Sequence, residues 1–130
     1  VAESLIVSGG EATGIEFGKR ALPELLSRNI PFTAIQTASD EIAIGVMEAA
    51  RERQLRIPED FSLVGFGGVS ILPYLSVRLT TIQESKAEMG QKAAEMLLEQ
   101  IEQYENNATP QARQIQLPGV LVEGASCRRV

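Results

Sequence analysis

The chain has 130 residues, of which 44% are hydrophobic and 22% charged, and its net charge is −5. These values are typical of one globular domain with its own core and are too apolar for a disordered chain. The negative charge argues against nucleic-acid binding by this chain itself, because such binding needs Lys and Arg to neutralise phosphates. The apolar stretches all fall short of the about 20 residues that span a bilayer. The absence of histidine excludes Ser–His and Cys–His dyads and His-containing zinc sites.

The first segment predicts a strand followed by a helix. The apolar run 5–7 ends at two glycines, as strands that lead into a turn do. Thr13 and Glu16 then have the spacing of a capping box, so we expect a helix that runs to about residue 28. Pro23 lies inside this helix and predicts a kink.

A second strand and helix follow, and then a third strand. Residues 32–37 are apolar and β-prone. Ser39 and Asp40 come directly after them and are placed to cap a helix at about 41–54. This helix is apolar on most of its faces, which predicts that it is buried. The third strand is predicted at 61–66, where two glycines close it.

The next segment predicts a short helix at 71–75, a strand at 79–82 and a long helix. Ser85 and Glu88 form a second capping box, which opens the clearest helix of the chain, ending near residue 106. Its apolar stripe comprises Met89, Ala93, Met96, Leu97 and Ile101.

The last segment predicts a loop at 108–112, a strand at 115–122 and a frayed tail at 124–130. Pro118 places this strand at an edge or a bulge, because proline lacks the N–H that a central strand donates. Since strands and helices alternate along the chain, the predicted fold class is α/β, with a parallel sheet covered on both faces.

Three short segments follow predicted strands, at 39–40, 67–68 and 83–84. Ligands of open α/β sheets bind at these carboxyl ends, and the helix that starts at the first segment offers free amides. From the residues alone, a simple helix cap is the favoured role of the first segment. Asp40 and Glu84 would make a catalytic carboxylate pair only if both converged on one cleft, and no third group is placed to position them.

The remaining motifs give weaker indications of function. Residues 65–70 have two of the glycines of a dinucleotide fingerprint, but Ser70 replaces the third and no acidic residue follows at the required distance. The glycines of segment 9–14 lack the Lys-Ser/Thr pair of a phosphate-binding loop. Cys127 is the single cysteine, so it forms no internal disulfide, which agrees with a reducing compartment. Two arginines follow it, but an ordinary thiol is the favoured interpretation.

Four segments together resemble one family. Residues 38–45 resemble the "AND-x-x-A-x-G" segment of LacI-type regulators, and residues 56–66 resemble their "R-V-P-x-D-V-S-V-V-G-F". Residues 79–82 with Met89-Gly90 are similar to "L-T-T-V…M-G", and residues 117–126 resemble the closing "L-P-x-x-L-V-E-R-x-S". The four segments occur in order and at the family's spacing, so the resemblance covers nearly the whole chain.

The resemblance implies an incomplete lobe of a periplasmic-binding-protein-like type I fold, in which the parallel sheet is the middle of three layers. Residues 1–82 and about 114–124 would belong to the second lobe of an effector-binding domain. The helix at about 85–106 would pack on a first lobe that the sequence does not contain. Its apolar stripe would then be exposed, and we expect it to dock on another copy, to swap or to move.

The resemblance also implies an effector site. Ser39, Gly67 and Glu84 fall on the positions of the Asn, Asp and Gln with which the family reads its effector, and Thr13 falls near that of a stacking aromatic. Asp40 would support the site as a helix cap. Gly67 removes a carboxylate that grips hydroxyl groups, whereas Glu84 introduces one and would repel an anionic effector. A sugar or glycoside is the expected effector.

The expected function is therefore ligand sensing in a bacterial, cytoplasmic transcription regulator that acts as a homodimer. Operator DNA would be bound only by a helix-turn-helix headpiece absent from this sequence, and we expect no cofactor, metal, membrane contact or catalytic residue. Two alternatives stay open. A soluble sugar-binding protein of a transport system shares the fold, although the Ile57–Asp60 segment resembles regulators more. A small α/β enzyme would use Asp40 and Glu84.

Overall fold

A computed structural model describes residues 2–106, 109 and 112–129. The chain divides into two compact units, which are described separately. Unit 1 contains the residues up to Gln83 and those from Leu121 on, and unit 2 runs from Glu84 to Val120. Most of the loop predicted at 108–112 lies outside the described residues.

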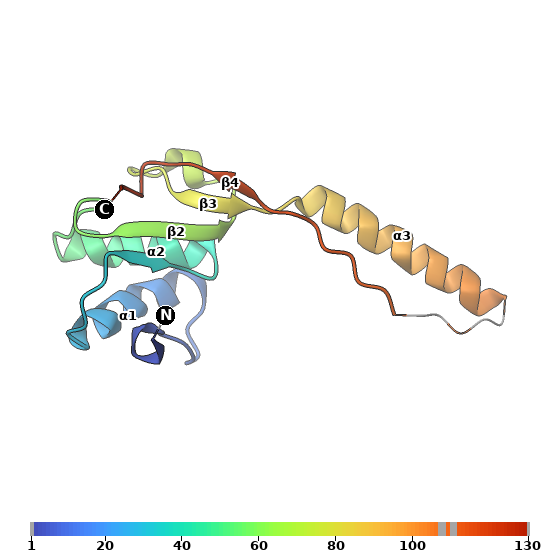
Figure 1. The fold of residues 1–130 in the computed structure, drawn as a ribbon, viewed down its shortest axis with the longest axis horizontal. Coiled ribbons are helices and arrows are strands. Elements are labelled where there is room, and N and C mark those ends of the chain that lie inside the picture. The colour runs from blue at the N-terminus through green and yellow to red at the C-terminus, as the bar shows by residue number, and fades with distance from the viewer. Residues whose placement is uncertain (1, 107–108, 110–111, 130) are drawn as a thin grey trace. The chain divides into compact units, whose positions relative to one another are not determined.

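Unit 1 is built around a sheet with the strand order β1-β2-β3-β4 (Figure 1). β1 (Ala34–Gln36), β2 (Ser62–Gly67) and β3 (Thr80–Gln83) are parallel neighbours, with Ile35 opposite Leu63 and Gly65 opposite Thr81. β4 is Val120–Val122 and lies at the edge next to β3. A single helix connects the parallel strands β1 and β2, since parallel pairing requires a crossover connection. The predicted α/β class with a parallel sheet is confirmed.

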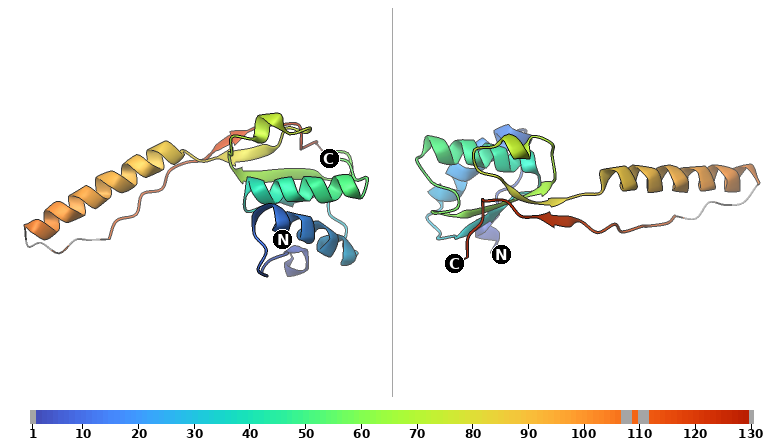
Figure 2. Two further views of the ribbon diagram at one scale, coloured as in Figure 1. Left: turned by 180° about the vertical axis from the view of Figure 1, so that it is seen from behind. Right: turned by 90° about the horizontal axis from the view of Figure 1, so that it is seen from above.

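The helices α1 (Gly14–Ser27) and α2 (Asp40–Glu52) lie next to each other in all views, and α2 lies along β2 (Figures 1 and 2). They approach most closely at Gly18 and Gly45. A Cβ atom on Gly18 would collide with the carbonyl oxygen of Ile42, and one on Gly45 with that of Ile15. The two backbones can therefore touch only because both positions are glycine.

The core of unit 1 lies where α1 and α2 meet the sheet. Leu22 of α1, Val46 of α2 and Leu63 of β2 are almost completely buried in one cluster. The prediction that the second helix is buried is confirmed. A short 3-10 helix, Leu72–Tyr74, stands where a short helix was predicted.

The strand predicted at residues 5–7 is wrong. The structure has a 3-10 helix at Glu3–Leu5, and Ile6 is extended but belongs to no strand. The guanidinium group of Arg28 donates hydrogen bonds to the carbonyl oxygens of Ser4 and Ile6, at 2.9 and 2.8 Å. A side chain therefore satisfies carbonyl groups that a neighbouring strand would otherwise bind.

The prediction of a frayed tail is also wrong. The hydroxyl of Ser126 is fully buried, donates to the carbonyl oxygen of Leu63 at 2.6 Å and accepts from the amide of Thr80 at 2.8 Å. The tail thus joins the amino ends of β2 and β3. Gly124 makes this possible, because a Cβ atom there would collide with the carbonyl oxygen of Arg78.

Unit 2 contains the long helix α3 (Lys86–Glu105), as predicted. None of its side chains, all of them described, is buried. The described residues 112–119 form no strand, so the last strand is shorter than predicted. Pro118 gives the physical reason, since it has no N–H to donate to a neighbour.

Neither predicted capping box forms its side-chain hydrogen bond. Thr13 has the extended backbone of a cap, but Gly14 follows at φ +54°, outside the helical range. Ser85 has φ −77° and ψ 65°, which is not the extended conformation from which a hydroxyl reaches the helix amides.

Candidate functional site

Ser39 lies between the carboxyl end of β1 and the start of α2. Its extended backbone makes it the N-cap, and its half-buried hydroxyl accepts a hydrogen bond from the amide of Ile42 at 3.3 Å. The predicted capping role of Ser39 is thus confirmed. The hydroxyl proton takes no part in this bond, so Ser39 can still donate to an acceptor at the edge of the sheet.

Asp40 is not the cap that we predicted. It is the first residue of α2, its side chain is fully buried, and it points into the unit instead of at the helix amides. One carboxylate oxygen accepts from the amide of Val69 at 2.9 Å and the other from the hydroxyl of Thr81 at 2.5 Å. A Cβ atom on Gly65 would collide with this carboxylate, so the glycine makes room for it. Asp40 therefore fastens α2 to β3 and to the turn after β2.

This role of Thr81 escaped the sequence analysis. The sequence did contain one indication of it. The hydroxyl of a threonine in the middle of a buried strand needs a hydrogen-bond partner. Asp40 uses both of its oxygens in these contacts. The arrangement supports a structural role for the carboxylate and does not favour the catalytic pair considered above.

Gly67 ends β2 and begins the turn that Asp40 holds. Its φ is +122° and that of Gly68 is +68°, both of which strain any residue with a side chain. A Cβ atom on Gly68 would also lie 2.7 Å from the Cγ atom of Gln83. At these two positions the chain can therefore offer backbone groups, but no side chain, to a ligand.

Thr13 is exposed at the start of α1. The starts of α1 and α2 are adjacent, since a Cβ atom built on Gly14 would lie 3.7 Å from the Cβ atom of Glu41. Both helices thus direct their amino ends, with their partial positive charge, to the same edge of unit 1. Oxygen atoms that carry a full or partial negative charge are favoured at such an edge.

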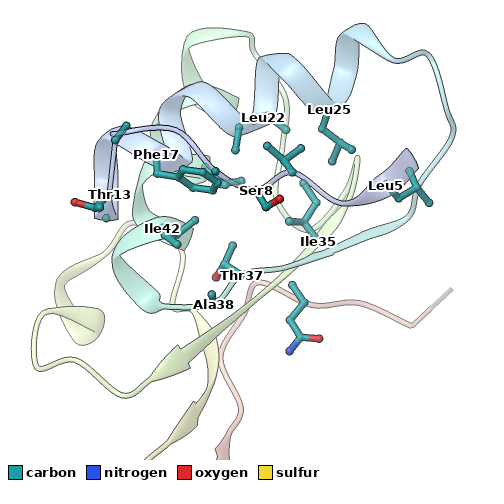
Figure 3. A pocket seen from close by; sticks show the side chains of 17 residues that line it. Leu5, Ser8, Thr13, Phe17, Leu22, Leu25, Ile35, Thr37, Ala38 and Ile42 are labelled. Atoms are coloured by element: carbon teal, nitrogen blue, oxygen red, sulfur yellow. The ribbon is translucent and has the colours of Figure 1, made fainter. Parts of the chain in front are cut away.

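A cavity of about 390 Å³ lies beside Thr13, between the N-terminal segment, α1, β1 and α2 (Figure 3). Figure 3 shows Phe17, Leu22 and Leu25 of α1 on one side of it and Ile35 and Ile42 on the other. Neither Ser39 nor Gly67 lines it. Because its walls are mostly apolar, this cavity is a poor match for a hydroxyl-rich ligand.

Glu84, the remaining predicted site residue, opens unit 2 and is half-buried. In unit 1 the structure therefore gathers Ser39, Asp40 and the turn from Gly67 at one edge of the sheet, with Thr13 at the start of the adjoining helix.

Elsewhere in unit 1, Cys127 is exposed, with its Sγ atom 3.4 Å from the carbonyl oxygen of Leu63. Throughout the described part of the chain, no helix combines the length and apolarity that a membrane crossing needs.

Known proteins are similar to this chain in sequence and in fold. The chain matches the periplasmic binding protein-like domain family over residues 5–127. It is 33% identical over 124 residues to the ribose operon repressor of Escherichia coli K12, and 40% identical over 101 residues to the transcriptional repressor PurR of E. coli O1:K1. These alignments cover 93% and 78% of the chain.

A solved structure of a LacI family transcriptional regulator from Enterococcus faecalis V583, with bound ribose, superimposes with a TM-score of 0.74. It is 34% identical, and the match covers 89% of this chain and 41% of that one. The chain spans 36% of the length of the ribose operon repressor and 29% of that of PurR. It therefore belongs to the periplasmic binding protein-like domain family and is a homologue of the LacI-family repressors.

Proposed function

We propose that the chain is part of the effector-sensing domain of a LacI-type transcription regulator and that the effector is a sugar. The half-buried hydroxyl of Ser39 carries the proposal. It stands at the carboxyl edge of the parallel sheet, at the start of a helix, beside a turn that a buried carboxylate holds. One donor and the amino ends of two helices suit a ligand rich in oxygen atoms.

The effector site consists, in this proposal, of Ser39, the backbone at Gly67, Glu84 and Thr13. The carboxylate of Glu84 accepts hydrogen bonds from sugar hydroxyls and repels anionic ligands such as sugar phosphates. Gly67 has no side chain, so the site lacks the hydroxyl-binding carboxylate that an aspartate at this position would supply. The ribose in the E. faecalis relative is an uncharged ligand of this kind.

The arrangement of the longer protein is part of the proposal. Residues 1–82 and about 114–124 belong to one lobe, and the helix at about 85–106 packs on a second lobe outside this sequence. Leu98 of α3 is 66% exposed and Tyr104 76%, which supports a partner for this helix. The regulator is a cytoplasmic homodimer that binds operator DNA through a separate headpiece, and the effector shifts the population of lobe arrangements.

Thermal unfolding of the full-length protein tests the function. A ligand at 100 times its Kd stabilises the folded state by about 2.7 kcal/mol and raises the Tm. We expect a rise with ribose or another neutral sugar and none with ribose 5-phosphate. If neither sugars nor glycosides raise the Tm of the wild-type protein, the proposal is wrong.

Two variants assign the site. Ser39→Ala should weaken the sugar-dependent rise, but it also removes a helix cap worth about 1 kcal/mol. Ser39→Gly also removes the hydroxyl but weakens the cap by only a few tenths of a kcal/mol, so it separates ligand binding from stability. Glu84→Gln should weaken the rise in the same way, whereas Glu59→Gln, a matched change at an exposed residue before β2, should leave it unchanged.

A further inference from the structure

Three buried polar side chains adjoin the residues that unit 1 contributes to the proposed effector site. Thr37, Asp40 and Thr81 are 6%, 0% and 1% exposed, so they have almost no surface that an effector could contact. Thr37 directly follows β1, Asp40 opens α2 and Thr81 lies in β3. Any influence of these side chains on effector binding must therefore pass through the residues that they hold.

The first connection fixes the backbone of Ser39. The hydroxyl of Thr37 donates to the carbonyl oxygen of Ser39 at 2.8 Å, with the carbonyl oxygen of Val64 at 3.2 Å as a second acceptor. The next residue along the chain is Asp40, which binds β3 through Thr81. Since the backbone of Ser39 is tied on both sides, the direction of its hydroxyl is restricted as well.

The second connection fixes the turn that begins at Gly67. Two successive glycines with positive φ give this turn more conformational freedom than other residues would, so ordering it costs more entropy. The carboxylate of Asp40 accepts from the amide of Val69 at 2.9 Å and holds the far side of the turn. Gly68 packs closely on Gln83, at the end of β3. The protein itself therefore orders the turn.

The third connection is the bond of 2.5 Å between the carboxylate of Asp40 and the hydroxyl of Thr81. Both donors to this fully buried carboxylate, an amide and a hydroxyl, are neutral. Burial of a charge costs free energy, which neutral donors and the amino end of a helix offset only in part. The single arrangement that such a group enforces explains it better than a gain in net stability does.

We propose that Thr37, Asp40 and Thr81 are positioning residues of the effector site. Without touching the effector, they hold the hydroxyl of Ser39 and the backbone of the turn from Gly67 in the geometry that binds it. Because these groups are ordered in advance, less conformational entropy is lost on binding and the affinity is higher. The inference rests on the proposed function, since it concerns the same site.

Ser126 provides a matched control for Thr81. It is also a fully buried hydroxyl that joins two strands, since it donates to the carbonyl oxygen of Leu63 and accepts from the amide of Thr80. Its hydrogen bonds hold the C-terminal tail on β2 and β3. Loss of either hydroxyl should lower the Tm, so effector affinity is the readout that separates a positioning residue from a merely structural one.

Titration calorimetry of the full-length protein with ribose tests the inference, or with the neutral sugar that raises the wild-type Tm most if ribose does not bind. Thr81→Val keeps the shape of the side chain and removes the hydroxyl. We expect the Kd to rise about tenfold, the factor that one hydrogen bond contributes. Thr81→Ser restores a hydroxyl and should recover most of the affinity. Ser126→Ala should lower the Tm and leave the Kd unchanged.

A second variant, Thr37→Val, covers the case in which Thr81→Val does not fold. Both carbonyl groups that lose the Thr37 hydroxyl keep a backbone partner, since Ser39 accepts from Ala43 and Val64 accepts from the amide of residue 37. The variant should therefore fold. Its Kd should rise at least about twofold, the lower end of what one hydrogen bond contributes.

A wild-type Kd in both Thr81→Val and Thr37→Val overturns the inference and leaves the proposed function intact. An equal rise of the Kd in Ser126→Ala also overturns the inference, because affinity would then follow overall stability. Failure of the proposed function looks different, since the wild-type protein itself would bind no neutral sugar. That result would overturn both.

Discussion

Helices α2 and α3 each have an apolar side, but their surroundings differ. In α2 the apolar side is buried, with Ala43, Val46 and Ala49 almost inaccessible to solvent. In α3, Met89, Leu97 and Ile101 remain exposed. Sequence periodicity reports that a helix has an apolar face, but it does not say which surface covers that face. We therefore expect that truncating apolar side chains of unit 1 lowers the free energy of unfolding far more than truncating apolar side chains of α3.

Truncation of leucines should give the largest contrast. Leu22 is 1% exposed and Leu98 66%. Leu22→Ala leaves a cavity in the core and should cost about 2–5 kcal/mol of the free energy of unfolding. Leu98→Ala should change it by less than about 0.5 kcal/mol in the 130-residue chain. Urea denaturation of both variants checks the difference, and similar losses would mean that α3 is packed in solution.

Two glycines sharpen the comparison. Gly45→Ala places a methyl group against the carbonyl oxygen of Ile15, so it should destabilise unit 1 by about 1–3 kcal/mol. Gly90 lies in α3, and a Cβ atom there meets nothing within 4 Å. Gly90→Ala should therefore stabilise the helix by about 1 kcal/mol, since alanine favours helices. Thermal unfolding followed by circular dichroism measures both, and a stabilising Gly45→Ala would refute the close approach of α1 and α2.

The smallest effect should come from an exposed carboxylate of unit 1. Hydrogen bonds from the backbone amide and side chain of Arg56 lower the pKa of Asp60, and the backbone bond is 2.7 Å long. Because its folded-state pKa is depressed, Asp60 stabilises unit 1 above its unfolded pKa of 3.8, and this contribution is lost as the pH falls through the folded value. Asp60→Asn should reduce the acid sensitivity of the urea midpoint.

Glu95 of α3 is the matched control for Asp60. Hydrogen bonds from Lys92 and Gln91 lower its pKa as well, but it lies on the helix without buried side chains. Glu95→Gln should leave the acid sensitivity of unit 1, measured on its own amide signals, unchanged. An equal effect of both substitutions would show that the two units unfold together.

Much of the fold follows from local sequence. The order of helices and parallel strands, the burial of α2 and the cap at Ser39 depend on side-chain periodicity and on hydrogen bonds between residues close in the chain. The family resemblance, which four segments carried, is confirmed by the match over residues 5–127.

Three features depended on partners distant in sequence: the role of Asp40, the position of the tail and the conformation of residues 5–7. Asp40 binds Thr81, 41 positions away, and Ser126 binds Leu63, 63 positions away. Local pattern cannot supply such partners, since a carboxylate that caps a helix and one that crosses to another strand look alike in sequence. The sequence alone thus determined the helices α1, α2 and α3 and the parallel strands β1, β2 and β3, and only the tertiary structure decided which buried polar groups meet. The reason is that burial obliges such groups to find a hydrogen-bond partner wherever the fold places one.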